Sequence, residues 1–312
     1  MSLHQGWADA PTTGAYQSHT VAPIFKQAAA DTFFLPLCDR RSISSGDEIT
    51  VPIGGLLDEP SNSALDESLS IPLDKLTITA KTIGMEERGR GVVWTKKAAT
   101  RSPIDLVELH RDRLSKQMSL DMDSLACDAF QAAQLKYQAT GAASYVMATA
   151  GAANTAATSN PNFWHIRKMR DLAYSTYLMK PRSNGKYIYV TATAGKRGIL
   201  MDPEFLAIHA PTGSSIFERS KVGTIEDVEI AEVNHGLSNT LGSSDDIGEG
   251  LFIADEAVYY AVLSMPSVHY DATEDFGRFV KLAWFGDYGF GTSTDSASAG
   301  LARILHFTSS VA

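Results

Sequence analysis

The sequence predicts an α+β protein with an early hairpin, one long helix, a mixed central region and closing strands. Two patterns carry this prediction. Apolar and polar residues alternate over 47–53 and 73–83, which is typical of β-strands because successive side chains point to opposite faces. Apolar residues recur at helical spacing through a stretch without glycine or proline from 104 to 140, which is typical of a long helix.

Composition limits the classes of function. The chain has 312 residues, of which 44% are hydrophobic and 20% charged, as expected of a folded soluble protein. Its formal net charge of −9 disfavours a protein whose main task is to grip nucleic acid, because neutralising phosphates takes clustered lysine and arginine. The same charge suits a container, which must not adhere tightly to its contents.

The cysteines and the apolar stretches predict the compartment. Cys38 and Cys127 form neither a disulfide framework nor a metal motif, and we expect two buried free thiols in a reducing compartment. The N-terminus lacks the basic start and apolar core of a signal peptide. No stretch reaches the roughly 18 apolar residues of a membrane span. We therefore expect synthesis in a cytoplasm and no membrane partner.

The first 45 residues are expected to form an arm. They begin small and polar, and apolar anchors without clear periodicity follow in the run 21–37, which contains Phe25, Phe33 and Phe34. Such a segment lies across another surface. That surface belongs either to the same chain or to a neighbouring subunit, and the sequence leaves both open.

A long hairpin is expected over residues 46–83. Its two alternating strands are separated by a polar loop that follows Gly54 and Gly55 and contains two acidic turns and a proline. A hairpin that is polar on both sides of its tip buries little core of its own. We expect it to offset its ordering entropy by docking elsewhere.

The most regular element is a helix expected from 103 to 137. Ser102 is the expected N-cap, Pro103 the first helical residue and Asp105 the acidic partner in a capping box. At 1.5 Å per residue, such a helix is a rod of about 50 Å. A charge-rich strand punctuated by glycines precedes it, over 84–102.

The second half of the chain reads as mixed helix and strand. The low-complexity segment 141–162 is the expected domain boundary, and a second helix is expected over 163–179. Further strands and short helices follow: a strand at 186–193, a helix at 194–200, a turn and strand at 221–234, a strand leading into a short helix at 250–263, and strands at 267–272, 278–290 and 302–307.

No motif predicts catalysis, a cofactor or a metal site. Gly89 and Gly91 begin a dinucleotide fingerprint, but Trp94 occupies the place of its third glycine. The closest approach to a phosphate loop, residues 194–197, lacks the first glycine and the hydroxyl. Histidines are scattered singly, so we expect no catalytic residue.

Carboxylate pairs are also expected to be structural. Asp121 and Asp123 lie two apart in the long helix and do not face each other, and Asp245 and Asp246 lie in a loop. We expect solvated carboxylates at both places, and no bound metal.

Mixed charge suggests assembly instead. Arg40 and Arg41, and the cluster 86–90, place charges of both signs on extended segments. Such charges suit intersubunit pairing, where electrostatics confers specificity, or they form an ordinary solvated face.

The order of these parts resembles the major capsid proteins of tailed bacteriophages with the Hong Kong 97 fold, and among them the N4-type family. The stretches that carry the resemblance are GDEITVPI, GRGVVWTKKA, SPIDLVELHRDRLSKQMSLDMDSLACDAF, and NGKYIYVTATAGKRGILMDPEF followed by KVGTIEDVEIAEVN. The resemblance covers the chain from about residue 21 to its C-terminus.

The resemblance implies four parts and a shell. They are an N-terminal arm at 1–45, an E-loop hairpin at 46–83, a P domain at 84–161 and 264–312 with spine helix 103–137, and an A domain at 162–263. It implies pentamers and hexamers in an icosahedral virion head around double-stranded DNA. The implied partners are a scaffolding protein, a portal and possibly a decoration protein, with no cofactor.

Intersubunit contacts are expected from arm, hairpin and charged strand: Phe25, Phe33, Phe34, Arg40, Arg41, Gly54, Gly55, Leu56, Asp58, Glu59, Glu86, Glu87, Arg88 and Arg90. Two alternatives stay open. An encapsulin nanocompartment uses the same architecture to carry enzymes, and a soluble α+β enzyme is the more distant alternative.

Overall fold

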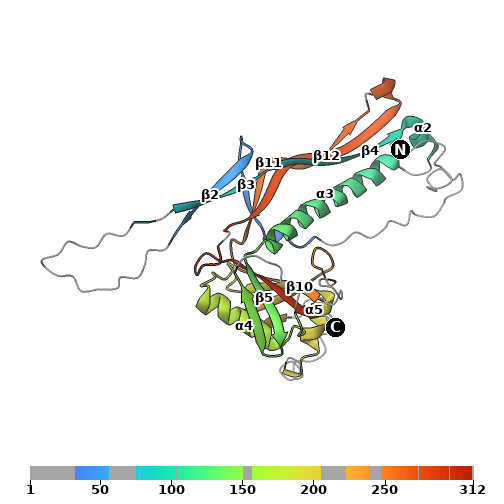
Figure 1. Ribbon diagram of the computed structural model, residues 1–312. Helices are drawn as coiled ribbons and strands as arrows, with labels where there is room; N and C mark the ends of the chain where they lie inside the picture. Colours follow the sequence, from blue (N-terminus) through green and yellow to red (C-terminus); the bar gives the residue numbers. More distant parts are fainter. Residues whose placement is uncertain are drawn as a thin grey trace.

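The computed structural model describes residues 32–55, 75–76, 78–102, 105–149, 157–204, 223–238, 240, 247–272, 274–294 and 296–310. These residues form a four-stranded sheet, a seven-stranded sheet and a two-stranded hairpin. Figure 1 shows the four-stranded sheet as an elongated layer with one long helix beside it. The seven-stranded sheet lies beyond one end of that helix, and the hairpin extends to the side.

The predicted hairpin is present. Strand β2 (Glu48–Gly54) pairs antiparallel with β3 (Ile78–Gly84), in a register that sets Glu48 opposite Gly84. Among the described hairpin residues, those at its base pack on the rest of the chain, where Ile83 is buried with residues of the four-stranded sheet. The loop residues 56–74, with the predicted contact residues Leu56, Asp58 and Glu59, lie outside the described part of the chain.

The four-stranded sheet has the order β1-β11-β12-β4. Strand β1 runs parallel to β11, and the other neighbours are antiparallel. The face of this sheet that contains Trp94, Leu282 and Trp284 buries these side chains in one cluster with Leu114 and Met122 of the long helix. The strands are β1 (Asp39–Ser42), β4 (Glu86–Thr95), β11 (Val258–Asp271) and β12 (Phe279–Thr292).

The long helix α3 spans Leu106–Gln131 and begins later than predicted. Its N-cap is Asp105, whose carboxylate accepts hydrogen bonds from the backbone N–H groups of Val107 at 2.9 Å and Glu108 at 3.2 Å. An aspartate at this position satisfies the free N–H groups of the first turn. Ser102 instead ends the short helix α2 (Lys96–Arg101).

Helix α3 also ends earlier than predicted. Ala132 closes it, and Leu135–Gly141 forms strand β5, not the last turn of a helix. Leu135 and Tyr137 are buried, and their backbones pair in parallel with strand β13 from the end of the chain. This tertiary pairing overrides the helical propensity of a stretch that contains no glycine or proline.

The seven-stranded sheet has the order β6-β5-β13-β10-β7-β9-β8. It joins strands from both sides of the segment 141–162 that was predicted as a domain boundary, and β6 lies inside that segment. Its strands are β5, β6 (Ser144–Ala148), β7 (Tyr187–Ala192), β8 (Gly223–Ile225), β9 (Val228–Val233), β10 (Ile247–Ile253) and β13 (Ile304–Ser310).

Two helices accompany this sheet. Helix α4 (Phe163–Asp171) continues in a π-helical turn (Leu172–Thr176), so the helix predicted to end at residue 179 is shorter. Helix α5 (Thr193–Leu200) matches the predicted short helix. None of the helices that the structure describes is long and apolar enough to cross a membrane.

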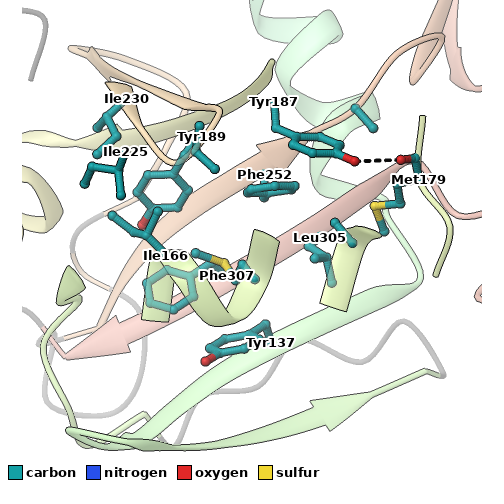
Figure 2. Packing of buried hydrophobic residues seen from close by; sticks show 14 of the residues in the cluster. Tyr137, Ile166, Met179, Tyr187, Tyr189, Ile225, Ile230, Phe252, Leu305 and Phe307 are labelled. Atoms are coloured by element: carbon teal, nitrogen blue, oxygen red, sulfur yellow. Dashed lines mark hydrogen bonds between the residues drawn. The ribbon is translucent and has the colours of Figure 1, made fainter. Parts of the chain in front are cut away.

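Aromatic side chains fill the core of this sheet, as Figure 2 shows. The ring of Phe307 lies between two tyrosines, with its centroid 5.4 Å from that of Tyr137 and 5.8 Å from that of Tyr189. The hydroxyl of Tyr187 donates a 2.7 Å hydrogen bond to the carbonyl of Met179, which satisfies a buried polar group. Core aromatics of this size dominate the energetics of burial.

One predicted helix is a strand. The residues after β10 were expected to become helical before residue 263, but they begin β11. Val258, Tyr260 and Val262 pack with α3 and its neighbours, while Tyr259 and Ala261 are covered by the base of the hairpin. A strand buried on both faces shows a continuous apolar run, which periodicity does not distinguish from a buried helix.

Candidate assembly surfaces

Strand β4 forms one edge of the four-stranded sheet and carries the predicted charge cluster. Glu86, Glu87 and Arg90 are exposed, and Arg88 is half-buried. The guanidinium of Arg88 lies 3.4 Å from the carboxylate of Glu86. Charges along an edge strand prevent indiscriminate strand pairing, and they leave an electrostatic pattern that a specific partner can match.

Strand β1 forms the opposite edge and carries Arg40 and Arg41, both exposed. The guanidinium carbon of Arg41 lies 5.0 Å from the ring centre of Tyr259 on the neighbouring strand, a cation–π contact. Because β11 and β12 separate the two edges, these arginines do not meet the charges of β4. The sheet therefore presents two distinct charged edges.

Phe33 and Phe34 contact their own chain. Phe34 is fully buried, 5.9 Å from the ring of Phe130 on α3, and Phe33 is half-buried beside it. The first described residues of the arm therefore lie on their own chain, which is one of the two alternatives that the sequence left open. The burial leaves no Phe34 surface for a neighbour in this conformation. Phe25 lies outside the described residues.

This arm is held by a buried carboxylate, so the prediction of a solvated Asp123 is wrong. Asp123 is completely buried and accepts hydrogen bonds from the backbone N–H groups of Phe33 at 3.0 Å and Leu35 at 2.8 Å. The Nε2 atom of His235 lies 2.7 Å from its other oxygen. Buried carboxylates persist where several donors meet them, so Asp123 is an anchor.

The neighbouring Asp121 is also engaged, accepting a 2.9 Å hydrogen bond from the hydroxyl of Tyr288 on β12. A signal for Asp123 was present in the sequence. It lies next to Met122 and three and four residues before Ala126 and Cys127, so it belongs to the apolar stripe of α3. An acidic residue in such a stripe requires a buried partner.

A second, half-buried carboxylate joins α3 to the other sheet. Glu249 on β10 lies 3.0 Å from His306 on β13 and accepts hydrogen bonds from the backbone of Ser238 and the side chain of Gln131. Burial raises the pKa of Glu249, but the hydrogen bonds from His306 and Ser238 outweigh burial and hold that pKa below its usual value. The end of α3 is thus tied to two strands and a loop.

The hairpin rests on the four-stranded sheet over two glycines. A Cβ atom at Gly289 would collide with the carbonyl oxygen of Gly84, and one at Gly291 would lie 2.9 Å from a side-chain carbon of Ile83. Glycine permits this close backbone approach. The hairpin therefore leaves the body at an angle that these glycines set, with Gly54 exposed and Gly55 half-buried at its far end.

The two glycine-containing motifs lie within regular secondary structure. Gly89 and Gly91 lie inside β4, and Lys196 lies within α5, where its ammonium contacts the carboxylate of Glu232 at 2.6 Å. Among the residues that the structure describes, no group of three or more His, Cys, Asp or Glu could hold a metal ion. The arrangement presents two charged sheet edges and a projecting hairpin, which are suited to contacts between proteins.

No protein-family model and no curated protein matches this sequence. Solved structures do. The chain aligns with a subunit of the head of Helicobacter pylori bacteriophage KHP40 at 16% identity and TM-score 0.70, over 93% of this chain and 95% of that one. It aligns with the acid-stable capsid of Helicobacter pylori bacteriophage KHP30 at 17% identity and TM-score 0.70, over 96% of this chain and 97% of that one.

The capsid of cyanophage Pam1 gives 14% identity and TM-score 0.68, over 95% of this chain and 98% of that one. At such identities the likeness concerns the fold. The chain therefore has the fold of tailed-phage capsid proteins, and the predicted fold class is confirmed.

Proposed function

We propose that this chain is the major capsid protein of a tailed bacteriophage and that its copies form the icosahedral head shell around double-stranded DNA. One observation carries the proposal: at least 93% of the chain aligns with at least 95% of each of the three capsid subunits described above. No sizeable segment of the chain remains for a separate activity. In this proposal the protein is a structural component and not an enzyme.

The shape of the chain supports this proposal. Figure 1 shows the hairpin β2–β3 extending away from both sheets. Its last described residues before β3 include Leu76, which is 48% exposed, and Ile78, at the start of β3, is 65% exposed. Two strands with exposed apolar side chains gain little stability alone. A neighbouring subunit that covers them supplies the missing burial.

The four parts follow the family pattern in this proposal. Residues 1–45 are the N-terminal arm, 46–83 the E-loop, 84–161 and 264–312 the P domain, and 162–263 the A domain. The strands at 135–148 and 304–310 nevertheless belong to the same sheet as those of 187–253, and β11 crosses from 258 to 271, so these two domains share structure at their boundaries. The placement within the N4-type family belongs to the same proposal. So do pentamers and hexamers, and the scaffolding, portal and decoration partners.

Assembly in this proposal rests on many weak contacts. An exposed ion pair contributes about 0–1 kcal/mol, so the charges of β1 and β4 confer register more than affinity. Repeated contacts from arm, hairpin and sheet edges act at high effective concentration once the first has formed. Together these contacts turn modest pairwise energies into a stable container.

The test is negative-stain electron microscopy with light scattering on the expressed chain, with and without a scaffolding partner. Shells, tubes or hexamer-sized rings are expected. A monodisperse monomer or dimer under all conditions would contradict the proposal and favour a soluble enzyme. Particles isolated from infected cells are expected to contain DNA that resists nuclease, whereas an encapsulin-like shell would contain protein cargo.

A further inference from the structure

The turn between β11 and β12 holds a phenylalanine entirely in solvent. Phe276 is 104% exposed relative to a free residue. Its φ of 54° and that of Asp275, 47°, lie in the left-handed region, followed by Gly277 at 82°. For a bulky residue this conformation is an outlier, and such strain persists where the surrounding structure enforces it.

The surrounding structure does enforce it. The backbone N–H of Arg278 donates a 3.0 Å hydrogen bond to the carbonyl of Asp275, and the two side chains form an ion pair at 3.2 Å. The carbonyl of Arg278 accepts a 2.7 Å hydrogen bond from the backbone of Lys96, at the start of α2. The tip is therefore a defined projection that presents one aromatic ring.

A groove of about 370 Å³ opens at the other end of the same sheet. This volume lies at the lower end of the range of small-molecule pockets, so it accommodates an aromatic side chain. The lining of the groove mixes apolar and charged side chains from β4, α3 and β12, together with Gly84 at the end of β3 and Met85. Its walls and rim include Met85, Arg88, Leu125, Ala129, Tyr288 and Phe290.

One molecule cannot fill its own groove with its own tip. Phe279 and Tyr288 are the ends of a continuous run of β12, and at about 3.4 Å per residue they lie about 30 Å apart. Figure 1 shows the tip of β11–β12 at the end of the sheet remote from the hairpin. The ring and the groove can therefore meet only between two molecules.

We propose that Phe276 of one copy inserts into this groove of a second copy. The inference rests on the self-assembly proposed above and names one of its contacts. The tip carries Glu274, Asp275 and Arg278, and the groove lining carries Glu86, Arg88 and Asp128, so each surface has charges of both signs that can pair with the other. A central aromatic ring with arginine beside it is typical of an interface hot spot.

The contact uses different surfaces on the two molecules, so it is heterologous. Such contacts propagate head to tail, closing into rings or extending into arrays. The rings of subunits in a shell require heterologous contacts of this kind. A self-complementary contact would instead stop at a dimer.

Site-specific crosslinking tests the contact directly. One batch of protein carries Phe276→Cys and another Met85→Cys, and the two are mixed before assembly and then oxidised. We expect a disulfide-linked dimer in the mixture and none in either batch alone. A mixture of Tyr270→Cys with Met85→Cys is the matched control, because Tyr270 is also exposed and belongs to the same hairpin of strands. Assembled mixtures without the 276–85 crosslink would overturn the proposal.

A second variant does not depend on crosslinking. Phe276→Asp is expected to fold normally, because the ring is fully exposed and aspartate tolerates the left-handed conformation. It should raise the protein concentration needed for assembly at least about tenfold, as for loss of a hot-spot residue. Tyr270→Asp should not.

The outcomes separate the two proposals. If the unmodified chain forms no large particle, the proposed function fails. If the unmodified chain and Phe276→Asp both assemble at the same concentration, only the contact proposed here fails.

Discussion

Asp123, in the middle of α3, accepts a 3.0 Å hydrogen bond from the backbone N–H of Phe33, ninety residues earlier in the chain. The same carboxylate binds the N–H of Leu35. Because the carboxylate is completely buried, it decides where the arm meets the body. The burial of Phe34 between these two bonds follows from this anchoring.

Replacing the anchor should destabilise the protein. Asp123→Ala leaves the N–H groups of Phe33 and Leu35 without their acceptor, at a cost of about 1–3 kcal/mol for each group that stays buried. Denaturant unfolding is expected to show a loss of about 2–4 kcal/mol. Asp123→Asn keeps an acceptor oxygen and should lose less. Equal stability of Asp123→Ala and the unmodified protein would refute the anchoring role.

His165 should make stability depend on pH. It is buried, with Nδ1 2.8 Å from the hydroxyl of Tyr137 and Nε2 3.0 Å from the carbonyl of Gly141. Burial lowers the pKa of His165 to about 4, although the hydrogen bond to Gly141 opposes this shift. A neutral ring protonated on Nε2 satisfies both partners.

The sign follows from the lowered pKa. Between pH 6.5, the ordinary value, and about 4, the unfolded chain binds a proton that the folded chain does not. The free energy of unfolding therefore falls as the pH falls through this window, by up to about 3 kcal/mol. The pKa of Glu249 is also lowered, from an ordinary value of 4.5. Protonation of Glu249 therefore reduces the free energy of unfolding only below about pH 4.5.

The measurement is denaturant unfolding at intervals from pH 7 to pH 4. His165→Gln should show a shallower decline over that window than the unmodified protein. His269→Gln, at an exposed position, should keep the original slope. If the free energy of unfolding falls with pH equally steeply in His165→Gln and in the unmodified protein, His165 is not the origin of the pH dependence.

The glycine under the hairpin should not tolerate a side chain. Gly289→Ala places a methyl group against the carbonyl of Gly84 and should displace the base of the hairpin. Thermal unfolding is expected to report a loss of about 1–3 kcal/mol, as for overpacking. Limited proteolysis should cut β2 or β3 faster. Gly54→Ala is the control, because nothing lies within 4 Å of the added atom. It should change neither the thermal stability nor the rate of proteolysis.

The charges of β4 should affect assembly more than folding. Arg88→Glu with Arg90→Glu removes an exposed ion pair, so the melting temperature should change little. Light scattering should report slower assembly, and added salt should reduce the difference between variant and unmodified protein. Replacing both arginines by lysine keeps the charge and should restore the rate. Unchanged assembly of the double glutamate variant would remove β4 from the list of contact surfaces.

Deleting Gly54 to Leu73 should leave a folded subunit without proper shells. The described contacts of the hairpin with the body come from its base, including Ile49, Val51 and Ile83, which the deletion retains. Circular dichroism should show the normal fold, and electron microscopy should show no closed particles. Normal particles from this deletion would count against the assignment of the hairpin as an assembly element.

Local patterns predicted several elements correctly. Strands β2 and β12 have one side facing a covered surface and one facing solvent, so their alternation is visible in the sequence. Strand β3 was predicted from the same alternation, although Ile78 and Ala80 are exposed and only Ile83 is buried. The charge cluster of β4 was recognised because it sits on an edge, where solvated charges are retained. The short helix α5 follows from local propensity and spacing.

Other features were invisible to local patterns. The first half of β11 is buried on both faces and reads equally well as a helix. Asp123 resembles a surface carboxylate until its donors, from ninety residues away, are known. The groove beside Tyr288 is built from β3, β4, α3 and β12, and α3 and β12 are distant in sequence from each other and from the two other strands.

By itself, the sequence determined the α+β class, the hairpin, the existence of a long helix and the absence of recognisable catalytic motifs. Each of these depends on residues within a few positions of one another. Tertiary structure decided where α3 stops, because Leu135 pairs with Leu305 at the other end of the chain. It also decided that the arm docks on Asp123 and that the hairpin rests on Gly289. These outcomes depend on contacts between distant residues, which burial and backbone hydrogen bonding establish only once the chain has folded.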